Sequence, residues 1–81
     1  MSVVDQSQNM VTFSWGFEAL YRAEYSGIVT VATAVTGDRA EGEDLAQDTM
    51  VKAFLHWPKV AGLDQPQAWC HRVLITAYRS R

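Results

Sequence analysis

The chain has 81 residues, of which 48% are apolar and 20% are charged. This length allows one small domain near the lower limit for an independent core, and the low charge excludes a largely disordered chain. The longest apolar run, residues 28–35, is too short to cross a bilayer, so we expect no membrane contact. The single cysteine, Cys70, cannot form an internal disulfide, and we therefore expect a reducing, cytoplasmic location.

Charge is divided unevenly along the chain. Residues 1–50 hold two basic and eight acidic side chains, whereas residues 51–81 hold five basic and one acidic side chain. In a short chain such a division of charge can arise by chance. The division also suits two partners of opposite charge, with phosphate at the basic end.

The first predicted element is a helix that starts near Phe13. Residues 1–12 show no sustained period and predict a flexible leader, which leaves residues 13–81 as the domain. Apolar residues then recur at three- and four-residue steps, as one face of a helix requires. These residues are Phe17, Leu20, Tyr21, Ile28, Val31, Ala32 and Val35. We expect Ser14 to cap the helix and Gly37 to end it in a left-handed conformation.

Two features of this stretch leave alternatives open. Gly27 costs about 1 kcal/mol relative to alanine inside a helix, and we expect it to allow close approach of another helix. The β-branched residues within 28–31 leave a strand as the weaker alternative for that part.

A second helix is predicted from Arg39 to the residue before Pro58. Asp38 with Glu41 three positions later forms a capping box, and Pro58 stops a helix. The apolar positions with helical spacing are Leu45, Thr49, Ala53, Phe54 and Trp57.

A third helix follows a predicted loop over residues 58–65. Pro66 suits its first turn, with Asp64 or Gln65 as the cap. Its expected buried stripe comprises Trp69, Cys70, Val73, Leu74 and Ala77. Three amphipathic helices with short connections predict an all-α fold, a compact three-helix bundle.

The sequence contains no set of residues that predicts catalysis. The five glycines are scattered, and His56 and His71 lack further ligands at metal-binding spacing. Cys70 and His71 are adjacent, so on a helix they point about 100° apart and cannot pair. The acidic residues of the second helix could bind a metal, but their overlap with the capping box favours a solvated helix start. We therefore predict no enzyme, no metal and no cofactor.

Two stretches resemble a known family. They are residues 37–54 (GDRAEGEDLAQDTMVKAF) and motifs within residues 57–75 (WPKVAGLDQPQAWCHRVLI). In this order and separation they resemble domain 2 of the extracytoplasmic-function (ECF) sigma factors, in particular those of actinobacterial type. The resemblance extends from about Phe17 to Arg81.

The resemblance implies that the second helix binds RNA polymerase. Asp44, Gln47, Asp48 and Val51 lie three or four residues apart and correspond to the surface that grips the coiled coil of the polymerase's largest subunit. Carboxylates and an amide pair well with arginines in a partly dry interface. The alternative is an ordinary solvated helix face.

The resemblance also implies that the third helix and the loop before it bind promoter DNA, mainly the non-template strand of the minus-ten element. A base turned out of that strand would enter a pocket formed by the loop, which holds the duplex open. Trp57 and Trp69 could stack on bases, although helix-spaced tryptophans usually fill cores. The implied DNA contacts are Lys59, Val60, Gly62, Leu63, Arg72, Thr76, Arg79, Ser80 and Arg81.

The chain departs from the family pattern at four places, one of which is Cys70-His71, where an apolar residue followed by a polar or aromatic one is more usual. Thr76 stands where an asparagine commonly helps to read a base, and Gly42 stands where alanine is more usual. The chain ends at Arg81, where family members continue toward a second helical domain that reads the minus-thirty-five element. We therefore expect a piece of a longer factor.

These observations predict a domain that recruits polymerase and melts the minus-ten element. One alternative is a small helical protein-interaction module that uses the acidic second helix and binds no nucleic acid. Another is a sigma-like remnant held by an anti-sigma protein.

Overall fold

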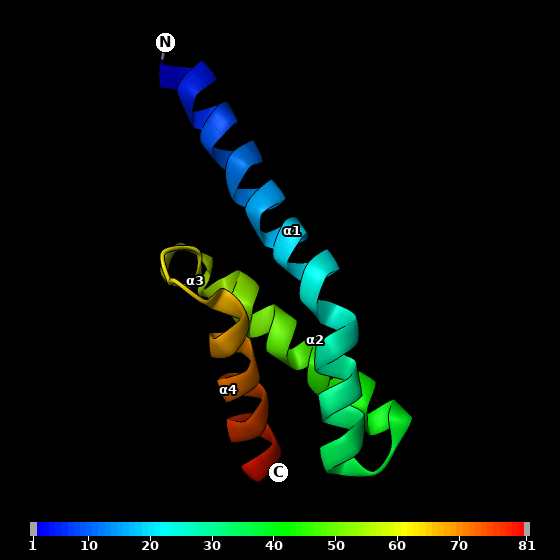
Figure 1. Cartoon of the computed structure of the whole chain (residues 1–81). Coiled ribbons are helices and arrows are strands. Elements are labelled where there is room, and N and C mark those ends of the chain that lie inside the picture. Colours follow the sequence, from blue (N-terminus) through cyan, green and yellow to red (C-terminus); the bar gives the residue numbers. More distant parts are fainter. Residues whose placement is uncertain (1, 81) are drawn as a thin grey trace.

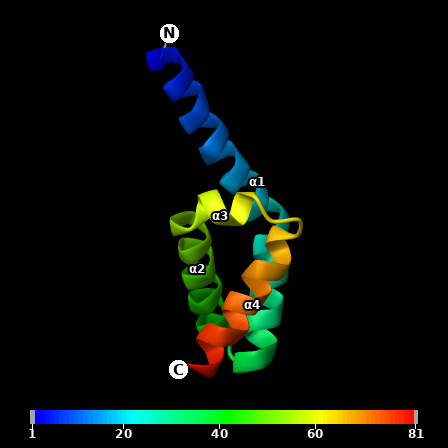
Figure 2. The same ribbon diagram turned by 90° about the vertical axis from the view of Figure 1, so that its left-hand side faces the viewer.

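The computed structural model describes the backbone of residues 2–80 and the side chains of residues 16–80. It contains helices α1 (Ser2–Thr36), α2 (Arg39–Leu55), α3 (Trp57–Ala61) and α4 (Pro66–Arg79), and no strand within the described residues (Figure 1). The predicted all-α fold is confirmed. The strand alternative for residues 28–31 is wrong. The three predicted helices form the bundle, and the five-residue α3 lies across its end between α2 and α4 (Figure 2).

Helix α1 begins at Ser2 rather than near Ser14, so Ser14 lies within the helix and does not cap it. The segment from residue 2 to residue 15 contains neither proline nor glycine, so nothing in it interrupts a helix. This part of α1 extends away from the other three helices (Figure 1). The division into a leader over 1–12 and a domain over 13–81 stays a prediction, with this correction to the helix boundary.

The turn between α1 and α2 forms as its residues predict. Gly37 has a φ of 76°, the left-handed conformation that favours glycine, and its N–H donates to the carbonyl of Thr33 at 2.8 Å. The Oδ1 atom of Asp38 then accepts from the backbone N–H of Glu41 at 2.9 Å. This bond satisfies one of the free donors at the start of α2, so the predicted cap is confirmed.

Helix α3 corrects the expected loop at residues 58–65. Helix α2 ends at Leu55, and Pro58 lies in the first turn of α3 instead of stopping α2. A proline costs no hydrogen bond there, because the first N–H groups of a helix have no partner within it. Trp57 and Val60 point the same way from this short helix, and both are buried. Helix α3 thus covers the end of the core.

The core is formed by residues of α1, α2 and α4. Its fully or almost fully buried members include Ile28, Ala32, Leu45, Ala46, Thr49, Met50, Ala53, Cys70 and Leu74. The buried stripe predicted for α4 divides into two parts. Cys70 and Leu74 are fully buried, while Trp69, Val73 and Ala77 are half-buried at its edges.

Gly42, not Gly27, permits two helices to approach closely. A Cβ atom on Gly42 would lie 2.5 Å from Oγ1 and 2.8 Å from Cα of Thr33 on α1. Gly27 is exposed and has nothing within 4 Å of its Cβ position, so the close approach predicted there is wrong. The unusual glycine of α2 is therefore explained by packing against α1.

An aromatic ladder on α1 connects it to α2 and α3. Phe17 makes edge contacts with Phe54 at 5.1 Å and with Trp57 at 5.8 Å between ring centroids. Tyr21 follows one turn later at 6.2 Å from Phe17. Trp57 is only 6% exposed, so its role is in the core and not in stacking on bases. A Cβ on Gly16 would lie 3.1 Å from this indole ring.

Candidate functional site

The outer face of α2, defined here as Asp44, Gln47, Asp48, Val51 and Leu55, is exposed along its whole length. The four residues predicted to bind polymerase all lie on it. Leu55 was not predicted, although it is 69% exposed, while Val51 is 53% exposed. Phe54, one of the apolar positions with helical spacing, is 47% exposed beside this face. Exposed apolar side chains of this size next to carboxylates are typical of a protein-binding surface.

Gln47 is held from α1. Its Nε2 atom donates to the hydroxyls of both Tyr21 and Tyr25 at 3.2 Å. The two tyrosine rings are stacked, with centroids 4.8 Å apart and planes 9° from parallel. Tyr25 was not among the predicted positions, although its four-residue spacing from Tyr21 places both on one side of α1.

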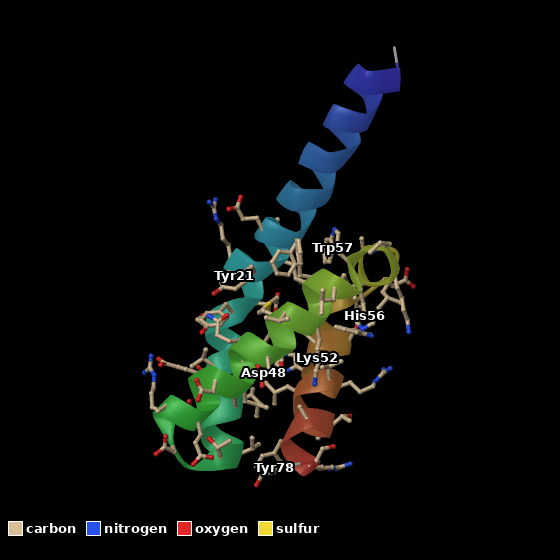
Figure 3. All side chains as sticks on the ribbon, turned by 180° about the vertical axis from the view of Figure 1, so that it is seen from behind. Tyr21, Asp48, Lys52, His56, Trp57 and Tyr78 are labelled. Carbon is tan, nitrogen blue, oxygen red and sulfur yellow. The ribbon has the colours of Figure 1, made fainter. Side chains whose placement is uncertain are left out.

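A groove of about 690 Å³ lies between α2 and α4. Asp44, Asp48 and Lys52 line its α2 wall, as Figure 3 shows for Asp48 and Lys52 beside α4. Its α4 wall is formed by Arg72, Val73, Thr76, Ala77 and, at the end of the helix, Ser80. Leu45 of α2 also lines the groove. This groove thus brings two residues predicted to bind polymerase together with three predicted to bind DNA, namely Asp44 and Asp48 with Arg72, Thr76 and Ser80.

The polar stripe predicted on α4 is exposed. Arg72, Thr76, Arg79 and Ser80 all face solvent, opposite the buried Cys70 and Leu74. The hydroxyl of Ser80 donates to the carbonyl of Thr76 at 3.0 Å, so this donor is already used within the chain at the end of the helix. Arg81, also predicted to bind DNA, lies outside the described residues.

A second groove, of about 470 Å³, lies where α3 leads into α4. It is lined by Lys59, Leu63, Asp64, Gln65, Ala68, Trp69 and Arg72. Trp69 is half-buried, packs against the core and makes an edge contact with His56 at 6.3 Å, and it also lines this groove. Arg72 lines both grooves and therefore stands at their junction.

Two residues predicted for this loop differ from expectation. Val60 is 0% exposed, so the predicted DNA contact is wrong. Its three-residue spacing from Trp57 on α3 turns both side chains into the core. Gly62 is exposed at the end of α3 but does not line the groove.

The cysteine of the chain, Cys70, lines neither groove. Cys70 is fully buried, and burial, with a smaller contribution from the negative charge of Glu24, raises the pKa of its thiol. No helix in the described part is long and apolar enough to span a membrane. What the two grooves offer is hydrogen bonding, charge and apolar contact.

A family model agrees with this arrangement. The family described as Sigma-70 region 2 matches residues 20–81, which include α2, α3, α4 and the second half of α1. The chain matches no curated protein and no solved structure with significance. Both grooves and the outer face of α2 lie within the matched residues.

Proposed function

Because this chain belongs to the Sigma-70 region 2 family, we propose that it recruits RNA polymerase and recognises the minus-ten element as domain 2 of an ECF sigma factor. Membership makes it a sigma-factor domain of transcription initiation, whose general partners are the polymerase core and promoter DNA. The family is not an enzyme family. We further propose that the chain is of the ECF type, that it makes the individual contacts described below, and that it is located in the cytoplasm.

The outer face of α2 would bind the coiled coil of the polymerase's largest subunit. Asp44 and Asp48 provide carboxylates for charge-assisted hydrogen bonds, which orient a basic partner. Val51 and Leu55 provide apolar area, and fully burying one such side chain contributes about 1.5–3 kcal/mol. The proposal therefore assigns orientation to the acidic half of this face and much of the affinity to its apolar half.

The α4 side would bind the non-template strand. Arg72 supports this assignment most strongly, since it is exposed and stands at the junction of both grooves. From there a guanidinium can reach a phosphate in one groove or a base edge in the other. Thr76 and Arg79 continue the stripe along α4, and Thr76 offers one oxygen where an amide would offer two atoms.

The groove at Trp69 would receive a base turned out of the strand. An aromatic face beside Lys59 and Arg72 provides stacking and phosphate attraction together, the combination that single-stranded nucleic acid favours. A domain that binds the open strand more tightly than the duplex shifts the equilibrium toward melting. No chemical step is required.

The test is binding to single-stranded DNA with a minus-ten-like sequence, measured by fluorescence anisotropy over a salt series. Arg72→Ala should weaken binding at least about fivefold and lower the slope of log affinity against log salt by about 0.7, the value for one lost phosphate contact. Arg22→Ala is the matched control. This arginine is exposed on α1, pairs with Glu18 at 3.6 Å and lies in neither groove.

Equal losses of DNA affinity in both arginine variants would show that binding depends only on net charge, and would contradict the assignment to α4. The exposed Val51, Phe54 and Leu55 also suit the alternative of a protein-interaction module without nucleic acid. Absence of DNA binding by the unaltered chain even at low salt would favour that alternative, or a remnant held by an anti-sigma protein.

A further inference from the structure

The amide of Gln47 is oriented by two residues that the family assignment does not explain. Its nitrogen faces the hydroxyls of Tyr21 and Tyr25, at 3.2 Å from each. A primary amide has two N–H donors, so these two bonds use both of them. The carbonyl oxygen lies on the other side of the planar group. No side chain among residues 16–80 donates to this oxygen.

Gln47 therefore offers only an acceptor to a partner. Asp44 and Asp48, its neighbours on the outer face of α2, are also acceptors when ionised. Asp44, Gln47 and Asp48 together present three neighbouring acceptors, which complement a partner that presents donors. Arginine has that property, since its guanidinium carries five N–H donors and no acceptor.

We propose that Tyr21 and Tyr25 are positioning residues for polymerase binding. They hold the Gln47 amide by its nitrogen, so that its oxygen joins Asp44 and Asp48 as an acceptor for arginine side chains of the polymerase. The inference rests on the proposed function of the outer face of α2. It extends that function to α1 and fixes the direction of one hydrogen bond.

The tyrosines are suited to this role because they are themselves fixed. Their rings are stacked and half-buried against the core, whereas Gln47 is exposed. A free glutamine on a helix surface loses rotamer freedom when a partner immobilises it. Ordering the side chain before binding removes part of that cost, so loss of the two hydroxyls should weaken binding about two- to tenfold.

The experiment measures the affinity of the fluorescently labelled full chain for RNA polymerase core enzyme. Four chains are compared: the unaltered one, Tyr21→Phe with Tyr25→Phe, Gln47→Ala, and all three changes together. Phenylalanine keeps the ring stack and removes only the hydroxyls. Tyr78→Phe is the matched control, since Tyr78 is an exposed tyrosine of α4 that does not bond Gln47.

The double phenylalanine variant should bind about two- to tenfold more weakly, with an unchanged thermal midpoint. In the Gln47→Ala background the same two changes should have no further effect, since the tyrosines act through that amide. A purely structural role would weaken binding in both backgrounds. Tyr78→Phe should bind like the unaltered chain.

Three results would overturn the inference. Full affinity of the double phenylalanine variant would show that the hydroxyls do not position Gln47. Additive losses would show that the tyrosines act independently of the amide. If the unaltered chain fails to bind core enzyme, the proposed function itself falls and the positioning role falls with it, an outcome distinct from the first two.

Discussion

Gly42→Ala tests a close approach between α1 and α2. The added Cβ would lie 2.5 Å from Oγ1, 2.7 Å from N and 2.8 Å from Cα of Thr33. Two of these atoms belong to the backbone, so rotating the Thr33 side chain cannot relieve the contact. Because ordinary contacts between carbon atoms are about 3.5–4.0 Å, the helices must separate locally by about 1 Å.

Overpacking of this kind costs about 1–3 kcal/mol, and backbone clashes place it near the upper value. Alanine recovers about 1 kcal/mol of helix propensity, which leaves a net loss of about 2 kcal/mol. For a domain of this size that corresponds to a fall in the thermal midpoint of about 10 °C. The assay is thermal and urea unfolding followed by the helical circular dichroism signal.

Gly27→Ala provides the matched control within the neighbouring helix. Its Cβ meets nothing within 4 Å, so only the propensity gain applies, and stability should rise by up to about 1 kcal/mol. Adding Thr33→Ala to the Gly42 variant should restore little, since the backbone atoms of residue 33 remain in the way. A Gly42→Ala chain as stable as the parent would refute the close approach of the two helices.

Two further changes probe the outer face of α2 and the core. Leu55→Ala should reduce capture by polymerase core at least about fivefold, since about 1.5–3 kcal/mol of apolar burial is at stake, while leaving the midpoint within about 2 °C. An unchanged capture would remove Leu55 from the interface. For Cys70, burial and Glu24 raise the pKa of the native thiol above its ordinary value of 9.0. The native state therefore binds the proton more tightly than the unfolded state. Stability from this group is complete below pH 9 and should be lost as the pH rises toward the higher native pKa. Cys70→Ala, compared by urea unfolding from pH 7 to pH 10, should show a smaller decline than the parent, and parallel declines would contradict this.

Local chemistry was enough to predict the end of α1 and the starts of α2 and α4. Gly37 and Asp38 act within a few residues of themselves, and the structure forms the turn and the cap that they predict. Pro66 likewise lies in the first turn of α4. Pro58 was misjudged because proline both ends one helix and starts another, and only packing of Trp57 and Val60 decides between them.

Contacts between segments that lie far apart in the chain could not be predicted from the sequence. Close helix contact was predicted at Gly27 but occurs at Gly42, because the contact depends on which face of each helix meets its neighbour. The bonds from Gln47 to the tyrosines cross 22 and 26 residues of chain and leave no local pattern. The exposed positions of Asp44 and Arg72 were predictable from helical spacing, but their shared groove was not.

The central claim is that α2 binds polymerase while α4 holds an opened promoter strand. It is tested most directly by the affinity of polymerase core for single-stranded minus-ten DNA, measured with and without the chain by fluorescence anisotropy. The chain should increase that affinity, and Arg72→Ala should remove most of the increase without preventing binding to core. An affinity unchanged by the chain, under conditions where the chain is bound to core, would contradict the account.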